Sequence, residues 1–351
     1  MDLLDTLRAL ADPTRLRIMR LLAHMELAVG ELAQVLGQSQ PRVSRHVRIL
    51  CDAGLAERRR EGGWVFLRAA ISEAGEGPKR AIGANAIGVA IARLLAVSEA
   101  ADPGFAQRAR EDLQHLDAIR SARAASAAEY FARHADEWDE LRSLHIADGP
   151  VEAALTAMLR SAGPESVDLG RLLDVGTGTG RMAELYAPVA SHVVAIDKSP
   201  EMLRIARARL QHLPPGSIEL VQGDFAALPF ADAAFDTVLF HQVLHYSHTP
   251  ETVLTEAARV TAPGGRIAIV DFAAHDREEL RHGHAHARLG FTDAQIATML
   301  DAAGFVPEAD RALAGHELIV KLWIARRQPD AVVSPLVPSL VSGRQPRQQK
   351  G

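Results

Sequence analysis

The sequence predicts a multidomain protein in which a small N-terminal α+β domain is followed by a larger α/β domain. Three observations carry this prediction. The chain of 351 residues is too long for one small domain. Residues 1–70 show short helical patterns and one hairpin, whereas residues 126–326 alternate between strands and helices. Between them we expect a helical linker with a dimerisation role at residues 71–125, and after them a disordered tail at residues 327–351.

The composition is that of an ordinary globular protein, with 48% hydrophobic and 24% charged residues. The net charge of −5 gives no general basic character, so a surface that binds nucleic acid has to be local. Cys51 is the only cysteine, which excludes an internal disulfide and a cysteine-rich metal site. No basic and apolar leader opens the chain, and its most apolar stretch, residues 81–97, is too short to span a bilayer comfortably. We therefore expect a cytoplasmic protein without a membrane partner.

The first predicted domain begins with three helical segments. Leucines at helical spacing mark residues 3–10 as a helix. Asp12 followed by Pro13 is a typical helix start, because aspartate caps the free N–H groups and proline fits the first turn. Residues 29–36 form a third, short helix that ends at Gly37.

A fourth helix and a hairpin complete the layout of a winged helix-turn-helix. Ser39 can cap a helix over residues 40–53 that ends at Gly54. Residues 55–60 and 64–69 then flank a Glu-Gly-Gly turn, which is a hairpin signal.

The fourth helix has the pattern of a recognition helix. Val43, Val47 and Leu50 recur at i, i+4 and i+7, so they would face the domain core. The opposite face then offers donors for base edges and phosphates, and arginines on the hairpin would meet the flanking phosphates. A solvated basic face is the alternative interpretation. The predicted DNA-contacting residues are Gln40, Arg42, Ser44, Arg45 and His46 on the helix, and Arg58, Arg59 and Arg60 on the wing.

Several stretches of this domain resemble the ArsR family of bacterial repressors. Residues 10–18, Leu-Ala-Asp-Pro-Thr-Arg-Leu-Arg-Ile, are similar to the opening signature of the family, and residues 39–46 and 53–55 to its recognition helix and exit. The resemblance implies a homodimer that binds palindromic operator DNA. Many members sense metals through a Cys-x-Cys pair, but residues 26–32 at that place read Glu-Leu-Ala-Val-Gly-Glu-Leu. Without these thiols, soft-metal sensing at that helix is not available.

The second domain opens with a strand and a glycine-rich turn. The buried-strand pattern of residues 172–175 leads into Gly176-Thr177-Gly178-Thr179-Gly180, and a helix follows near Arg181. Glycines at such a turn allow a ligand to approach the backbone closely. Their spacing differs from the dinucleotide fingerprint and from a P-loop. For the loop taken alone, a structural tight turn is the alternative.

Four further strands extend the pattern. Residues 192–197 end in Asp197, whose carboxylate suits hydrogen bonding to ribose hydroxyls. Residues 218–222 are followed by Asp224 and Phe225, which are placed to accept from an adenine amino group and to pack on its ring. The fourth and fifth strands cover residues 236–239 and 266–270.

This whole run resembles class I S-adenosylmethionine-dependent methyltransferases, especially those of ubiquinone and menaquinone biosynthesis. The resemblance implies that the domain is Rossmann-like and that its cofactor is S-adenosylmethionine or S-adenosylhomocysteine. A Rossmann-like domain for another nucleotide is the alternative. By their places in the motifs, Asp174, Gly176, Gly178 and Gly180 would contact the amino acid portion of the cofactor, Asp197 the ribose, Asp224 and Phe225 the adenine, and His241 with Gln242 the region of the sulfonium.

Candidate catalytic groups follow from the chemistry. Methyl transfer needs positioning and sometimes a base, rather than a fixed triad. His241 is the candidate catalytic residue, and His245 and His248 are further candidate bases, although each also fits a structural role. Upstream, the pairs Tyr130-Phe131 and Trp138-Asp139 either close over the cofactor or belong to the core.

The histidines and the single cysteine of the chain bear on two metal-related functions, a metal site and arsenite methylation. His275 and the His-Gly-His-Ala-His stretch of residues 282–286 suggest a metal site, but no obvious coordination shell is complete, and we predict no metal. Arsenite methylation needs several cysteines and is excluded because only Cys51 exists.

Two functions remain in view. The first is a transcriptional regulator whose methyltransferase domain senses S-adenosylmethionine or S-adenosylhomocysteine. The second is an active methyltransferase that acts on a small-molecule methyl acceptor, with a DNA-binding domain that controls its own operon. The glycine loop does not separate them, because a sensor and an enzyme both need it.

Overall fold

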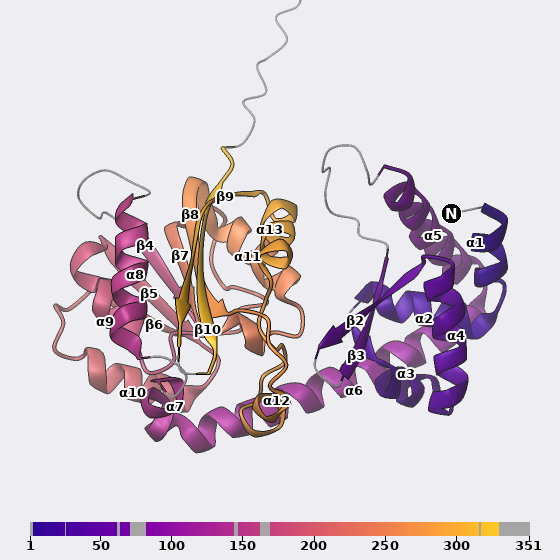
Figure 1. The fold of residues 1–351 in the computed structure, drawn as a ribbon, viewed down its shortest axis with the longest axis horizontal. Coiled ribbons are helices and arrows are strands. Elements are labelled where there is room, and N and C mark those ends of the chain that lie inside the picture. Colours follow the sequence, from indigo (N-terminus) through magenta and orange to yellow (C-terminus); the bar gives the residue numbers. More distant parts are fainter. Residues whose placement is uncertain are drawn as a thin grey trace, which may run out of the picture.

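The computed structural model describes residues 3–24, 26–61, 64–70, 82–143, 147–161, 169–315 and 317–329. These residues form two domains that a long helix connects (Figure 1). The tip of the predicted hairpin, the first part of the predicted linker and the predicted tail from residue 330 onward lie outside the described residues.

The N-terminal domain has the helix-turn-helix and wing that the sequence predicts. Its sheet has the order β1-β3-β2, and both pairs are antiparallel. The elements are α1 (Leu3–Leu10), α2 (Pro13–His24), β1 (Leu27–Ala28), α3 (Val29–Leu36), α4 (Gln40–Asp52), β2 (Ala56–Glu61) and β3 (Trp64–Ala69).

Local signals explain most of these boundaries. The Asp12 carboxylate accepts the backbone N–H groups of Thr14 and Arg15 at 2.8 and 3.1 Å, so it caps α2 as predicted. Gly37 ends α3 in the left-handed region, at φ +63°. Ser39 precedes α4, but its side chain makes no capping hydrogen bond, so that prediction was wrong in its detail.

Two further helices, α5 (Ile82–Ala101) and α6 (Pro103–His134), follow the wing. Leu95 of α5 and Leu116 of α6 are buried in the same apolar cluster as the recognition helix α4. Arg17 of α2 also forms an ion pair with the buried Asp112 of α6 at 2.6 Å. The first half of α6 therefore packs with the N-terminal domain, whereas its second half runs to the other domain, as Figure 1 shows along its lower edge. The predicted boundary between residues 125 and 126 lies inside this helix.

The C-terminal domain is a seven-stranded sheet with helices on both faces. The strand order is β6-β5-β4-β7-β8-β10-β9, and the pairs are parallel except those that β10 makes with β8 and β9. The strands are β4 (Arg171–Val175), β5 (His192–Asp197), β6 (Ile218–Gln222), β7 (Phe235–His241), β8 (Thr261–Phe272), β9 (Phe305–Ala314) and β10 (Ile319–Arg327).

The connecting segments of this domain are mostly helical. The α-helices are α7 (Trp138–Ser143), α8 (Asp148–Ser161), α9 (Arg181–Tyr186), α10 (Pro200–Leu210), α11 (Pro250–Val260), α12 (Glu278–Gly283) and α13 (Asp293–Ala302), and the short 3-10 helices are η1 (Ala135–Glu137), η2 (Ala187–Val189) and η3 (Leu244–Tyr246). Thr292 caps α13 by accepting the N–H of Gln295.

Apolar runs in the central strands bury both faces of the sheet. Leu172 packs in the layer that contains α8 and α9, and its neighbour Leu173 packs in the layer that contains α11 and α13. The fifth predicted strand is longer than expected, because β8 already begins at Thr261. Its pairing with β7 shifts register between Phe235 and Thr237, where the Pro-Gly-Gly sequence bulges out.

No helix in the described ranges is both long enough and apolar enough to cross a lipid bilayer.

Candidate functional site

A cavity of about 340 Å³ opens at the carboxyl ends of β4, β5, β6 and β7. β4 and β7 are neighbours in the sheet, but the chain passes from β4 outward to β6 before it returns to β7 on the other side. In open α/β sheets, ligands bind at such a point of reversal. The topology therefore places this cavity where a cofactor is expected.

Most of the residues predicted to bind the cofactor come together at this cavity. Gly180 is the exception, because it does not line the cavity but begins α9 and packs on α10, where a Cβ atom would lie 3.1 Å from Ala206. The predicted residues that line the cavity are Asp174, Gly176, Gly178, Asp197, Asp224, Phe225, His241 and Gln242.

The glycine loop fits closely between its neighbours. Gly176 has φ +65°, and a Cβ atom there would overlap with the side chain of Val243, which follows β7 in the chain. The backbone N–H of Gly178 donates to the Asp197 carboxylate at 2.8 Å, which joins the loop to the end of β5. The loop is therefore held in place by the strand that supplies the predicted ribose acid.

Two carboxylates at the inner end of the cavity are largely removed from water. Asp174 accepts the Thr177 hydroxyl at 2.6 Å, and its burial raises its pKa to about 6. Burial also raises the pKa of Asp197, although this carboxylate accepts N–H groups from Gly178 and Ser199, each at 2.8 Å. Each carboxylate oxygen can accept a second hydrogen bond, so both groups keep acceptor capacity for a ligand.

Asp224 lies in a different environment at the same cavity. Burial works against its ionisation, but hydrogen bonds from Lys198 and from the backbone of Ala226 outweigh it, so its pKa lies below the usual range. The Lys198 ammonium is 2.9 Å from the carboxylate. Asp224 is therefore an ionised acceptor that already has partners.

His241 is buried at the end of β7. Burial, together with the nearby Arg142 guanidinium, lowers its pKa to about 3. Its Nε2 atom has no hydrogen-bond partner among the described residues. A group with so low a pKa is a poor proton acceptor at neutral pH, so His241 is better suited to hydrogen bonding than to base catalysis.

The aromatic residues before β4 divide between two places. Phe131 and Trp138 line the cavity and contact Tyr246 of η3, with ring centroids 4.8 and 6.2 Å from it. Tyr130 instead bonds with His284 at 3.0 Å and lines a second, smaller cavity. Phe131 and Trp138 thus reach the predicted cofactor site, which was one of the two alternatives for this segment.

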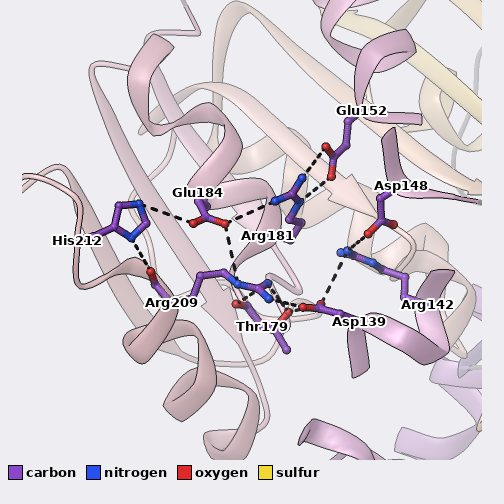
Figure 2. Close-up of polar contacts among 9 residues, drawn as sticks. All are labelled: Asp139, Arg142, Asp148, Glu152, Thr179, Arg181, Glu184, Arg209 and His212. Carbon is purple, nitrogen blue, oxygen red and sulfur yellow. Dashed lines mark hydrogen bonds and ion pairs between the residues drawn. The ribbon is translucent and has the colours of Figure 1, made fainter. Parts of the chain in front are cut away.

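Helix α7, which carries Trp138, is tied down by charged groups (Figure 2). Asp139 accepts the hydroxyl of Thr179 at 2.7 Å and pairs with Arg209 of α10. Arg142 pairs with Asp148 at 2.6 Å. The helix that covers the cavity is therefore clamped to the glycine loop, to α10 and to the start of α8.

Sequence reasoning missed Arg142, which lines both cavities with a nearly buried side chain. A signal was present, because Arg142 follows Trp138 at the i+4 spacing that places two side chains on one helix face. Ser247 and Thr249, which flank the candidate base His248, also line the first cavity and belong to no motif that would have revealed them.

The predicted DNA-contacting residues do not all share one surface. Gln40, Arg42 and Arg45 of α4 are exposed, and Ser44 is half-buried. His46 points back into the domain, where its Nδ1 lies 3.7 Å from a carboxylate oxygen of Asp12. On the wing, Arg58 is exposed, whereas the side chains of Arg59 and Arg60 lie outside the described residues.

The remaining histidine candidates have separate surroundings. His248 lines the first cavity, and His245 lines the second. Among the side chains that the structure describes, no group of three or more potential metal ligands gathers in one place.

Comparisons with known proteins assign both domains. Residues 173–269 match the family described as "methyltransferase domain", and residues 12–58 match the family described as "bacterial regulatory protein, arsR family".

Relatives and solved structures resemble the larger domain. The demethylmenaquinone methyltransferase of Renibacterium salmoninarum is 40% identical over 103 residues, which are 29% of this chain and 41% of that protein. That of Tropheryma whipplei is 33% identical over 162 residues, which are 45% of this chain and 64% of that protein. The chain thus spans less than two thirds of either relative. The N-methyltransferase NodS of Bradyrhizobium japonicum, solved with S-adenosyl-L-homocysteine, is 18% identical, with a TM-score of 0.48 over 57% of this chain and 98% of that chain.

The family matches and the strand order agree with the two-part organisation. The chain therefore combines an ArsR-type helix-turn-helix domain with a Rossmann-like class I methyltransferase domain, whose cofactor is S-adenosylmethionine or S-adenosylhomocysteine.

Proposed function

We propose that this chain is a DNA-binding transcriptional regulator whose methyltransferase domain senses S-adenosylmethionine or S-adenosylhomocysteine. One arginine that joins the wall of the cofactor cavity to the DNA-binding domain carries this proposal. Arg288 is nearly buried and forms an ion pair with Glu26, directly before β1, at 2.7 Å. The same guanidinium donates to the carbonyl of His248, a residue of the cavity wall, at 2.9 Å.

A second contact crosses the same interface. The Arg281 guanidinium of α12 lies over the ring of Phe66 in the wing strand β3, 5.3 Å from its centroid. The backbone N–H of Arg288 donates to the carbonyl of His245, within η3, at 2.9 Å. These contacts therefore connect the cavity wall directly to the strands beside the recognition helix, so a structural change in the wall can reach them. Such a connection is what coupling between two binding sites requires.

In this proposal, different residues at the cavity bind different parts of the cofactor. Asp174 accepts from the ammonium of the amino acid portion, while Gly176 and Gly178 let that portion approach the backbone. Asp197 accepts from the ribose hydroxyls. His241 and Gln242 line the cavity near the sulfonium, and Asp224 and Phe225 bind the adenine. When bound as S-adenosylmethionine, the cofactor supplies an electrophilic methyl group.

The proposal includes a homodimer on operator DNA. Of the eight large apolar side chains that are exposed among the described residues, four belong to α1 and α5: Leu4, Leu7, Leu94 and Val97. Apolar patches of this kind mark protein interfaces. We assign the DNA-binding domain to residues 1–70, dimerisation to residues 71–125 and cofactor binding to residues 126–326. A regulator that reads operator DNA works in the cytoplasm.

The test is a titration of operator binding by the full-length protein with each ligand separately. DNA fragments selected from a random pool serve as operator, and affinity is measured without ligand, with saturating S-adenosylmethionine and with saturating S-adenosylhomocysteine. We expect one ligand to change operator affinity by about 5- to 150-fold, the usual range of allosteric coupling. Unchanged affinity with both ligands would overturn the sensor.

The contact itself is tested by Arg288→Met, which keeps the apolar stem but removes the charge. We expect this variant to bind DNA and cofactor, but to lose most of the ligand response. The matched control is Arg326→Met, which breaks an ion pair with Glu308 on the sheet edge formed by β9 and β10. If operator affinity in Arg288→Met responded fully to the ligand, this contact would not transmit the coupling.

A second candidate function is methyl transfer to a small-molecule acceptor, with the DNA-binding domain controlling the operon of the enzyme. Relatives of the larger domain that are named as methyltransferases favour it. Incubation of the protein with S-adenosylmethionine and a cell extract of low molecular mass tests it. Formation of S-adenosylhomocysteine above that with extract alone supports the enzyme, and no formation argues against it.

A further inference from the structure

A second, small cavity adjoins the cofactor cavity. The two share Trp138, Arg142, Gln242 and Tyr246 in their linings. The second cavity holds about 20 Å³, which is enough for one water-sized group but not for a whole organic molecule. It can therefore receive one functional group of a ligand whose remainder lies elsewhere. Its further lining residues are Tyr130, Leu141, His245, Phe272, His284 and His286.

One wall of this cavity is a buried histidine–aspartate pair. The Nδ1 atom of His245 lies 2.7 Å from Oδ1 of Asp271, at the end of β8. The other carboxylate oxygen, Oδ2, accepts the backbone N–H of His245 at 3.1 Å, and Oδ1 also accepts that of Phe272 at 2.7 Å. His245 and Asp271 are 1% and 0% exposed, so the pair is removed from water. Asp271 thus fixes both the position and the orientation of the imidazole ring.

This arrangement determines the role of the second ring nitrogen. Because the carboxylate accepts at Nδ1, the ring proton is held there, and Nε2 carries the free lone pair. Nε2 is buried and has no hydrogen-bond partner among the described residues, although His245 lines the cavity. An acceptor that is buried without a donor is costly, so a site that leaves one exposed to a cavity is prepared for a donor from a ligand.

The remaining walls define the ligand. Leu141, Tyr246 and Phe272 give an apolar and aromatic surface, and the Tyr130 hydroxyl is engaged with His284. Burial lowers the pKa of His284, which favours the neutral form of this imidazole. The nearly buried Arg142 guanidinium also lines the cavity, which disfavours an amine cation, and an ionised acid has no donor for Nε2. An apolar and aromatic pocket with one acceptor and one cation fits an aromatic hydroxyl group, whose oxygen becomes negative as its proton leaves.

We propose that the second cavity is an acceptor subsite in which Nε2 of His245 is the general base for an aromatic hydroxyl compound. This proposal rests on the second candidate function, methyl transfer to a small molecule. His245 removes the hydroxyl proton, the oxygen attacks the methyl carbon, and the bond from that carbon to sulfur breaks. The products are the methyl ether, S-adenosylhomocysteine and a proton, which His245 releases to solvent. Asp271 is a positioning residue that holds the base.

The test uses full-length protein saturated with S-adenosylhomocysteine, so that no turnover occurs. The probe is para-nitrophenol, whose phenolate absorbs visible light and whose phenol does not. At a pH below the pKa of the free probe, we expect the protein to bind it and to increase its phenolate fraction. His245→Gln should reduce the phenolate signal at least tenfold, and Asp271→Asn should reduce it too, because an amide no longer fixes the tautomer. Affinity for S-adenosylhomocysteine should stay within about threefold.

The control is His192→Gln, at the amino end of β5 and away from both cavities, which should keep the signal. Tyr130→Phe is a second variant for the cavity wall and should weaken probe binding with the fold retained. Binding of the cofactor without any phenolate signal from wild-type protein overturns the subsite alone, as does an undiminished signal in His245→Gln. Failure of the wild-type protein to bind S-adenosylhomocysteine overturns the cofactor assignment and the subsite together.

Discussion

Asp174 and Asp224 line the same cavity, but their surroundings move their pKa values in opposite directions. Burial raises the pKa of Asp174 to about 6. Asp224 has its pKa lowered, because Lys198 and a backbone N–H outweigh its burial. At pH 5, Asp174 is therefore mostly protonated while Asp224 is ionised. Of these two groups, only Asp174 changes its charge close to neutral pH, so it contributes a pH dependence to cofactor binding there.

Cofactor affinity should rise between pH 5 and pH 7. An ionised Asp174 attracts the cofactor ammonium, and a group of pKa near 6 goes from about one-tenth to nine-tenths ionised over this range, which predicts about a tenfold gain. Calorimetric titration with S-adenosylhomocysteine measures it. Asp174→Asn should bind weakly at every pH. An equally steep pH dependence in that variant would show that another group is responsible.

The raised pKa of Asp174 has the opposite consequence for the stability of the ligand-free protein, because ionisation of this carboxyl then lowers the free energy of unfolding. Because the pKa of Asp174 in the folded protein lies above the ordinary aspartate value of 3.8, folding favours the protonated acid. Its contribution to stability is therefore greatest at low pH and falls as the pH rises from about 4 to 6, by about 3 kcal/mol in total. Without ligand at pH 7, Asp174→Asn should raise the free energy of unfolding in denaturant titrations. A lower free energy of unfolding would contradict the raised pKa.

Two substitutions should separate the two binding functions. Asp197→Ala removes the proposed ribose acceptor and the partner of the Gly178 N–H, and we expect cofactor affinity to fall by about 10- to 100-fold, with DNA affinity in the absence of ligand unchanged. Arg45→Ala removes an exposed cation of the recognition helix and should weaken operator binding by about 1–3 kcal/mol, with cofactor affinity unchanged. Fluorescence anisotropy and calorimetry give the two affinities. A joint loss in either variant would contradict this separation.

At the level of elements, α7 is the cover of the cofactor cavity. It is only six residues long, so it depends on the ion pairs of Asp139 and Arg142 rather than on its own helical stability. Burial opposes ionisation of Asp139, but hydrogen bonds from Arg209 and Thr179 dominate and lower its pKa. The clamp is therefore fully present above the usual pKa of an aspartate and is lost as the pH falls through the lowered value.

Arg209→Met should loosen this cover. We expect faster hydrogen exchange over residues 138–143 and cofactor binding that is several-fold weaker, with little change in global stability, because Arg209 is partly exposed. The control is Arg204→Met on the same helix, whose ion pair with Asp136 is exposed on both sides. Equal effects of the two substitutions would contradict the clamp. Mass spectrometry of exchanged peptides reports the first effect, and calorimetry the second.

The elements with strong local signals were the ones that sequence predicted well. Residues 192–197 are a strand with the predicted bounds, because an apolar run marks a buried parallel strand. Residues 218–222 also have the predicted bounds, although they form an edge strand with polar residues in it. The bulge before Arg266 and the strand pair β9–β10 were not predicted, since both depend on pairing with distant strands. His46 was placed on the outer face by its neighbours in sequence, but Asp12 draws it inward. Tertiary contacts of that kind leave no periodic signal.

At the level of the whole molecule, the candidate site combines segments that are far apart in the chain. The glycine loop and the acids after the strands were predicted because their spacing is local. The pairing of His245 with Asp271 was not, because only the folded sheet brings the ends of β7 and β8 together. Arg142 of the cover was missed although it shares a helix face with Trp138. The contact of Arg288 with Glu26 joins residues from opposite ends of the chain, so no local pattern could indicate it.

Self-association should depend on the exposed leucine and valine of α5. Leu94→Glu combined with Val97→Glu is expected to convert a homodimer into a monomer and to lower operator affinity, because a palindromic site gains from two linked readers. Light scattering during size-exclusion chromatography gives the mass. The matched control, Ile319→Glu, changes an equally exposed apolar residue in the other domain and should leave the mass unchanged. A monomeric wild-type protein would rule out this dimer.

The length of helix α6 determines how one domain is rotated relative to the other about the helix axis. Its 32 residues extend over about 48 Å, and each residue added within it turns everything downstream by about 100°. An insertion of one residue in its middle would therefore swing the cofactor domain out of line and pull Arg288 away from Glu26, even with both domains correctly folded. Seven extra residues, close to two full turns, would nearly restore the angle but shift the domains apart by about 10 Å. The number of residues in α6 thus determines both the relative orientation of the two domains and the contact of Arg288 with Glu26.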